Sequence, residues 1–242
     1  MTEPLPVWSP PVNLPSGIRL VQTLRGGEGW GFNLAGHVGA PAAEVARHRA
    51  RLQAQLTGID QIQWLTQIHG IDVVEAPSAV NAEADAQWTT QAGVACVVMT
   101  ADCLPLLFWR ADASLVGAIH AGWRGLAAGV IETTVRALPP SASALQVWLG
   151  PRIGTTAFEV GDEVRAAFVA HSPAASAAFV ASSRAGHWLG DLGALARLRL
   201  KGLGITHVTD SAACTVTESQ RWFSFRRDGQ CGRMASVIWR AQ

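Results

Sequence analysis

The chain has 242 residues, enough to bury a substantial core, and its 49% hydrophobic and 15% charged content excludes a disordered protein. Its formal net charge of +1 supplies no general attraction to nucleic acid or to anionic membranes. The Pro-rich start, residues 1–17, lacks the pattern of a signal peptide, and no run of about 18 apolar residues occurs. We therefore expect a cytoplasmic protein that binds neither nucleic acid nor a membrane, and the length allows one large domain or two small ones.

Apolar runs and turn residues predict an irregular alternation of strands and helices. Strands are expected at 18–24, 62–66, 72–75, 97–100, 115–119, 146–149, 205–208 and 234–239. Helices are expected at 41–56, in a segment that ends near 136, and at 191–201, and residues 158–169 indicate a strand followed by a helix. Residues 171–186 are predicted to be a surface excursion. Neighbouring strands without helices between them favour an α+β (mixed α/β) fold over a doubly wound parallel sheet.

Three reactive side chains stand where predicted strands end. Residues 62–66 lead to His69, residues 97–100 lead to Cys103, and residues 115–119 stop at His120. Catalytic zinc sites use three ligands of these residue types and leave a fourth position for a water that the metal acidifies. The wide spacing is a weak signal, because each residue alone is more often a packed side chain.

The same ligand types suit two other kinds of site. Two histidines and one cysteine also form blue-copper sites, but multicopper oxidation needs a histidine-rich cluster, and seven histidines without an H-x-H pair are too few. Alternatively, Cys103 is a nucleophile and His69 or His120 is its base. The four cysteines are expected to be free thiols in a reducing compartment.

Arginines and aromatic residues supply candidates for substrate binding. A guanidinium binds phosphate through two parallel hydrogen bonds, although a surface salt bridge is an equally good expectation for any single arginine. Aromatic rings could wall a flat base, although most of them should lie in the core. The arginine candidates are Arg49, Arg124, Arg226, Arg227 and Arg233, and the aromatic candidates are Phe32, Trp123, Phe158, Phe223 and Phe225.

Several motifs in succession resemble the YfiH family, also called the laccase-domain or polyphenol-oxidase family. They are TQIHG at 66–70, TADCLP at 100–105, HAGWRG at 120–125, GP at 150–151 with FEVG at 158–161, and FSFRRDG at 223–229 with GRM at 232–234. The chain departs from the family pattern at Phe158, where tyrosine is frequent, and at His48-Arg49, where an Asn-Arg pair is expected.

The resemblance implies a fold and a chemistry. The fold would be a single domain over residues 18–242 with β-sheets sandwiched between helices, similar to the catalytic domain of cytotoxic necrotizing factors. A zinc ion, with copper as the alternative metal, would be held by His69, Cys103 and His120. The implied activity is phosphorolysis of adenosine, inosine and methylthioadenosine together with adenosine deamination, so the implied partners are small molecules, a purine nucleoside and phosphate. The alternatives are a peptidoglycan-precursor editing amidase that acts on a nucleotide-linked muramoyl-serine unit and a copper-dependent polyphenol oxidase (laccase).

We predict specific roles for residues around this centre. The catalytic candidates are Cys103, Arg49, and Asp102 as a weak candidate for the proton shuttle. The candidates for binding substrate or phosphate are Arg49, Arg124, Asn33, Phe158, Phe223 and Arg226.

Overall fold

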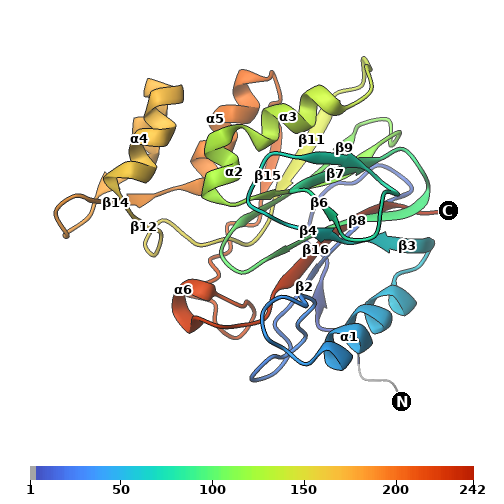
Figure 1. The fold of residues 1–242 in the computed structure, drawn as a ribbon. Coiled ribbons are helices and arrows are strands. Elements are labelled where there is room, and N and C mark those ends of the chain that lie inside the picture. Colours follow the sequence, from blue (N-terminus) through green and yellow to red (C-terminus); the bar gives the residue numbers. More distant parts are fainter. Residues whose placement is uncertain (1–3) are drawn as a thin grey trace.

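Two mixed β-sheets face each other at the centre of the molecule, and helices cover their outer faces (Figure 1). The structure is a computed structural model that describes residues 4–242. The five-stranded sheet has the order β1 (Val7–Trp8), β2 (Ile18–Thr23), β16 (Met234–Arg240), β8 (Gly93–Thr100), β3 (Ile59–Gln63). The six-stranded sheet has the order β15 (His207–Asp210), β11 (Leu145–Leu149), β9 (Leu104–Arg110), β10 (Val116–Ala121), β7 (Ala86–Thr89), β5 (Val73–Glu75).

Smaller elements complete the fold. A three-stranded sheet has the order β12 (Glu159–Gly161), β14 (His187–Gly190), β13 (Phe179–Ala181), and a two-stranded sheet pairs β4 (Leu65–Thr66) with β6 (Ala82–Glu83). The helices are α1 (Ala42–Gln55), α2 (Trp123–Ala128), α3 (Val130–Ala137), α4 (Asp162–His171), the 3₁₀ helix η1 (Pro173–Ala178), α5 (Leu192–Gly202) and α6 (Phe225–Asp228). None of the helices in residues 4–242 combines the length and apolar character that a membrane crossing requires.

The alternation of side chains along β8 explains the layered packing. Val94, Cys96 and Val98 point into the space between the sheets, where they pack with residues of β9 and β10. Val97 and Met99 point to the opposite face, which α1 covers. Because both faces of the strand are buried, β8 consists almost entirely of apolar residues. The outer face of the six-stranded sheet packs in the same way against α2, α3, α4 and α5.

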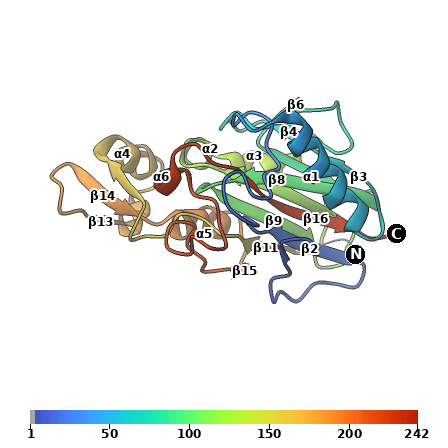
Figure 2. The same cartoon turned by 90° about the horizontal axis from the view of Figure 1, so that it is seen from below.

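The mixed α/β fold with sheets between helices is confirmed, but strand β9 was not predicted and the prediction for residues 171–186 is wrong. Strand β9 escaped prediction because Pro105 near its start has no N–H to donate, which is typical of a strand edge or a loop. It nevertheless lies between β10 and β11. Residues 171–186 are more than a surface excursion, because η1 and β13 lie there, and β13 joins β14 in a lobe beside the large sheets (Figure 2).

The crossing from one sheet to the other positions the reactive cysteine. Strand β8 belongs to the five-stranded sheet and β9 to the six-stranded sheet, so residues 101–103 connect the two layers. His120 lies near the end of β10, next to β9, and His69 lies in the connection between β4 and β5. Three segments that are distant in sequence therefore meet at one end of the sheet sandwich.

We predict that Gly117→Ala, near the start of β10, destabilises the protein by about 1–3 kcal/mol through overpacking. A methyl group at Gly117 would overlap the Phe108 ring and lie 2.6 Å from the backbone oxygen of Gln87. Gly202 is the matched control, because a methyl group there meets nothing within 4 Å. Urea denaturation should show a lower midpoint for Gly117→Ala and an unchanged or slightly higher one for Gly202→Ala. Equal midpoints for the two variants would contradict the packing described for β10.

Candidate metal centre

His69, Cys103 and His120 converge on one point. Their ligand atoms all lie within 4.8 Å of one another, close enough to hold one metal ion. We call these three residues the metal-competent group, and it is the group of this kind found in residues 4–242. The Cys103 Sγ lies 3.9 Å from His69 Nε2, and the two imidazole rings stand nearly perpendicular with centroids 4.8 Å apart. Two imidazole nitrogens and one thiolate are a ligand set that suits zinc and other borderline-soft metals.

Asp85 is the residue that holds two of the three ligands in place. Its carboxylate is fully buried and accepts the Nδ1–H of His120 at 2.7 Å, which leaves Nε2 of that ring as the ligand atom. It also accepts the backbone N–H groups of Ile68, His69 and Gly70 at 2.7–3.1 Å. The latter bonds stabilise His69 in a left-handed conformation, φ 60°, which costs free energy for a residue other than glycine.

Sequence reasoning missed the role of Asp85. The signal was a single acidic residue in the otherwise uncharged stretch 84–89, just before a buried strand. Burial alone would raise the pKa of Asp85, but the hydrogen bond and charge of His120 and the N–H groups of Gly70 and Ile68 outweigh it and lower the pKa. The carboxylate is therefore ionised and available to orient His120 at neutral pH.

The absence of a side chain at Gly122 provides the space that the His69 and Cys103 side chains occupy. A methyl group at this position would lie 2.8 Å from His69 Cδ2 and 3.2 Å from Cys103 Sγ. Gly125, one turn into α2, lets the helix approach the chain, because a methyl group there would lie 2.6 Å from the Gly70 oxygen. The glycines of the HAGWRG motif thus serve close packing around the metal-competent group.

Cys103 and His120 shift each other's proton affinity. Burial raises the pKa of Cys103, but the charge of His120 and hydrogen bonds from His120 and His69 outweigh it and lower the pKa to about 6. Burial lowers the pKa of His120, but the charge of Cys103 and the hydrogen bond to Asp85 raise it to about 9. A divalent cation would replace the proton that this pair holds, so metal binding should release protons.

The group opens onto a cavity of about 250 Å³. The residues that line it are His37, Gln67, His69, Met99, Thr100, Ala101, Cys103, His120, Phe225 and Arg233. A second cavity of about 600 Å³, lined by Arg49 among others, shares His37, Gln67 and Met99 with the first. Three ligands with one open side are typical of a catalytic rather than a structural metal site.

Two predicted aromatic candidates and one predicted arginine lie away from the 250 Å³ cavity. Phe158 belongs to the core beneath α2–α5, and Phe223 is fully buried in a separate cluster near Met234. The ring that lines the cavity is Phe225, which is 58% exposed. Arg124 is exposed and stacks on Trp123, with 4.6 Å between its guanidinium carbon and the ring centroid.

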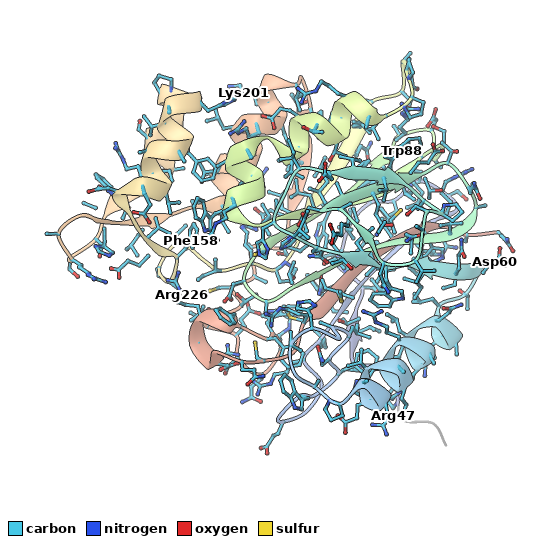
Figure 3. All side chains as sticks on the ribbon, viewed as in Figure 1. Arg47, Asp60, Trp88, Phe158, Lys201 and Arg226 are labelled. Atoms are coloured by element: carbon cyan, nitrogen blue, oxygen red, sulfur yellow. The ribbon has the colours of Figure 1, made fainter. Side chains whose placement is uncertain are left out.

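Three other predicted residues connect segments around the cavity. Asp102 accepts the Thr215 hydroxyl at 2.5 Å and the Arg226 backbone N–H at 2.7 Å, which ties the start of α6 to the chain beside Cys103. The Arg226 guanidinium donates to the backbone oxygens of residues 157 and 159, next to Phe158 (Figure 3). Asn33 is buried and accepts the backbone N–H of Arg233 at 2.9 Å.

We predict that Asp85→Asn weakens zinc binding about 10- to 100-fold, the usual effect of removing a carboxylate that orients a metal-bound histidine. Asparagine cannot accept all the hydrogen bonds that the Asp85 carboxylate accepts, and its amide group would face donors. Zinc titration against a competing chelator measures the change. Asp72→Asn, an exposed position close to His69 in the chain, is the control and should bind zinc as the wild type does. Unchanged affinity in Asp85→Asn would exclude the orienting role.

In the metal-free protein, we predict that iodoacetamide modifies Cys103 with a half-maximal rate near pH 6, because the thiolate predominates above the lowered pKa. Cys96 should stay unmodified, because it is fully buried and burial raises its pKa far above the usual value. Pulse labelling between pH 5 and pH 9 followed by peptide mass analysis separates the cysteines. A half-maximal rate near pH 9 at Cys103 would show that the imidazoles do not activate it.

Similar proteins are known by sequence and by structure. Purine nucleoside phosphorylase PA4543 of Pseudomonas aeruginosa is 47% identical over 208 residues, which cover 86% of this chain and 85% of that protein. Purine nucleoside phosphorylase YfiH of Escherichia coli is 44% identical over 210 residues, 86% of each chain. The crystal structure of Neisseria meningitidis protein NMB0706 is 41% identical, covers 98% of this chain and 100% of its own, and superimposes with a TM-score of 0.91.

The family assignment rests on a match along almost the whole chain. YlmD from Geobacillus stearothermophilus, at 30% identity, superimposes with a TM-score of 0.83 over 94% of this chain and 93% of its own. The family model described as "Multi-copper polyphenol oxidoreductase laccase" matches residues 24–241. The resemblance found in the sequence motifs is confirmed, and this chain belongs to the laccase-domain YfiH family.

Proposed function

We propose that this chain is a zinc-dependent purine nucleoside phosphorylase that acts on adenosine, inosine and methylthioadenosine and also deaminates adenosine. The observation that carries the proposal is the three-ligand group with one side open to a cavity, in a chain whose relatives bear the phosphorylase name. The proposed partners are therefore small molecules, and the proposed location is the cytoplasm.

The residues present fit a zinc ion. His69, Cys103 and His120 would hold it, Asp85 would keep the His120 ring in the binding orientation, and Gly122 leaves the space between them. When bound, zinc supplies Lewis-acid catalysis at an oxygen atom next to the substrate. The three residues line the cavity, which supports the proposal that this chemistry acts on a bound nucleoside.

The cavity offers both an apolar and a polar wall to a nucleoside. Phe225 presents an exposed ring that suits stacking against a purine. Thr100 is 2% exposed and lines the same cavity, and its hydroxyl has no hydrogen-bond partner in residues 4–242. A buried hydroxyl without a partner costs about 1–3 kcal/mol, so a polar ligand that supplied one would gain affinity.

In the proposed phosphorolysis, phosphate attacks the anomeric carbon while the purine leaves with the electrons of the glycosidic bond. Arg49 remains the candidate for holding phosphate, because it lines the cavity adjoining the metal centre. We assign Asp102 a positioning rather than a proton-transfer role, because both its carboxylate oxygens already accept hydrogen bonds. In deamination, water adds to C6 of adenine and ammonia leaves.

A second candidate follows from the low pKa of Cys103. A thiolate between two imidazoles can attack an amide carbonyl, release the amine with a proton from the imidazolium, and yield a thioester that water hydrolyses. This chemistry would suit a peptidoglycan-precursor editing amidase. Copper-dependent polyphenol oxidation is less well supported, because residues 4–242 contain one metal-competent group of His, Cys, Asp and Glu and not a cluster.

The test is turnover of inosine with phosphate by the purified, zinc-loaded protein. We expect release of hypoxanthine and ribose 1-phosphate, and a loss of at least about 100-fold in kcat/KM for His120→Ala because the metal is lost. His207→Asn, an exposed histidine on β15, is the matched control and should retain full activity. Stoichiometric zinc without hypoxanthine release or adenosine deamination would refute the purine assignment. A substrate-derived mass trapped on Cys103 would then favour the amidase.

A further inference from the structure

Two arginines that line the adjoining cavities have no acidic partner among the residues that the structure describes. Other arginines form ion pairs, and these pairs are Arg25–Asp228, Arg152–Asp210, Arg197–Asp210, Arg199–Glu132, Arg221–Glu218 and Arg227–Asp228. Arg49 and Arg233 have no carboxylate within 4.0 Å among residues 4–242, and each lines one of the two adjoining cavities. Their positive charges therefore face the cavities without compensation.

Contacts hold the Arg49 side chain in place, but one of its guanidinium nitrogens has no hydrogen-bond acceptor in residues 4–242. Its Nε donates to the Leu34 oxygen at 2.8 Å, and its Nη2 lies 3.9 Å from Met99 Sδ. The guanidinium stacks on Trp64, with 4.0 Å to the ring centroid. Nη1 has no hydrogen-bond acceptor in the described part of the chain. The side chain is thus preorganised, with a donor left for a ligand.

Arg233 stands on the other cavity wall and is equally constrained. Its Nη1 donates to the backbone oxygens of Cys231 and Gly232 at 2.8 and 3.1 Å, and its guanidinium lies 5.8 Å from the Phe225 ring centroid. The bond from its backbone N–H to Asn33 fixes the main chain. The Nε and Nη2 groups have no acceptor among residues 4–242, so two parallel donors are available.

His37 is common to the cavity that Arg49 lines and the cavity that Arg233 lines. It lines both cavities, and its ring makes no hydrogen bond within the described residues. Burial, followed by the charges of Arg233 and Arg49, lowers the pKa of His37. The two arginine charges therefore reach the same point, and no carboxylate offsets them there. A neutral imidazole can donate one hydrogen bond from its N–H group to an anion.

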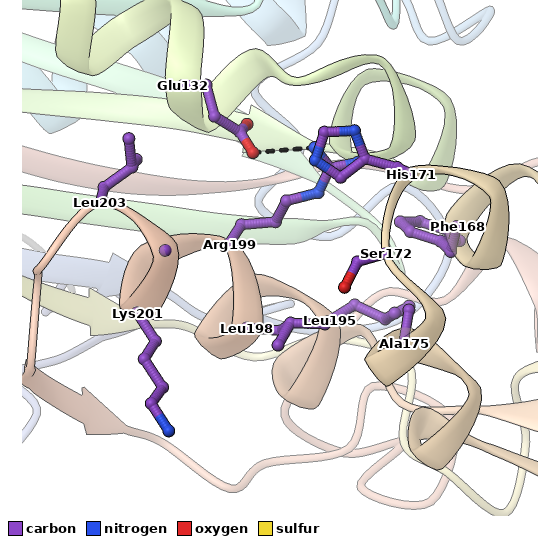
Figure 4. Close-up of a pocket in the computed structure, with 11 residues that line it drawn as sticks. Glu132, Phe168, His171, Ser172, Ala175, Leu195, Leu198, Arg199, Lys201 and Leu203 are labelled. Carbon is purple, nitrogen blue, oxygen red and sulfur yellow. Dashed lines mark hydrogen bonds and ion pairs between the residues drawn. The ribbon is translucent and has the colours of Figure 1, made fainter.

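A third cavity contains an arginine whose charge is compensated. It has a volume of about 620 Å³ and lies between α3, α4 and α5, away from the metal centre (Figure 4). Arg199 at its wall pairs with Glu132 at 2.8 Å and also donates to the Ala127 oxygen. The charge of Arg199 is therefore neutralised, which distinguishes this arginine from Arg49 and Arg233, although Lys201 also lines the cavity.

We propose that Arg49, His37 and Arg233 form a phosphate-binding site beside the metal centre. A phosphate dianion matches the two guanidinium groups in charge and in hydrogen-bond geometry. The ligand is inorganic phosphate or the phosphate group of a nucleoside monophosphate. This inference deepens the proposed phosphorylase and rests on it only for the use of phosphate as a co-substrate. Arg124, which stacks on Trp123 and lines neither cavity, has no part in the site.

The first experiment measures equilibrium binding of inorganic phosphate by calorimetry, without nucleoside. We expect Arg49→Gln, His37→Gln and Arg233→Gln each to weaken phosphate binding at least tenfold, about 1.4 kcal/mol. Arg47→Gln is the matched control, because Arg47 is on the same helix as Arg49 but is exposed, and its affinity should stay within twofold. In turnover, the KM for phosphate should rise in the three variants while the KM for inosine changes little.

Further variants separate binding from folding. Arg233→Gln also removes the bonds to Cys231 and Gly232, so Arg233→Lys, which keeps the charge, should recover part of the phosphate affinity. His37→Gln removes no intramolecular hydrogen bond, so its melting temperature should match the wild type. Unchanged phosphate affinity in both Arg233→Gln and His37→Gln, or an equal loss in Arg47→Gln, would overturn the site.

The second experiment distinguishes the two sources of phosphate. The nucleotide is a ligand of the site if inosine monophosphate competes with inorganic phosphate for binding and if the same three substitutions weaken the binding of inosine monophosphate. Phosphate binding without such competition would identify inorganic phosphate. Binding of neither to the wild type would refute the inference. If the protein binds phosphate but does not cleave a nucleoside, the phosphorylase proposal is refuted and the phosphate-binding site is retained. If the protein cleaves nucleosides and the three variants have an unchanged KM for phosphate, the phosphate-binding site is refuted and the phosphorylase proposal is retained.

Discussion

The buried carboxylate of Asp85 is the interaction on which the metal-competent group depends. A charged group removed from water is stable only when strong hydrogen bonds replace its hydration. Four donors do so here, namely the His120 ring and three consecutive backbone N–H groups around His69. One side chain thereby connects the strand that carries one ligand to the turn that carries another. The strained backbone of His69 and the orientation of His120 share a single cause.

The two-sheet architecture supplies the third ligand. The chain leaves one sheet at the end of β8 and enters the other at the start of β9, so Cys103 occupies the short passage between layers. The thiol therefore lies at the end of the sheet sandwich and not within its apolar interior. Burial raises the pKa of Cys96 on β8 and leaves it an inert thiol, whereas the imidazoles around Cys103 lower its pKa. The difference between two cysteines only seven positions apart is thus one of environment.

Several polar residues around the cavity act on neighbouring chain segments. Asn33 fixes the backbone of Arg233, and Asp102 fixes the start of α6, which carries Phe225. His48, at the position that departs from the family pattern, lies with Nδ1 3.0 Å from the Asn33 oxygen and so belongs to the same network. Through these bonds, the segments that contribute an arginine and an aromatic ring to the cavity are attached to the sheet ends that carry the metal-competent group.

The sequence by itself determined the class of fold, most strand and helix positions and the three metal-competent side chains. Strands and helices could be predicted because apolar periodicity is a local property of the sequence. The three side chains could be named because the ordered motifs that contain them identify the family. The tertiary structure alone decided the partner of His120 and which of the candidate arginines and aromatic rings line the cavities. Asp85 and His120 meet because β7 pairs with β10, and Arg233 lines the same cavity as His37 because the last strand returns beside β2. Such pairings between distant strands leave no local pattern, since the same residue types would serve equally well at the surface or in the core.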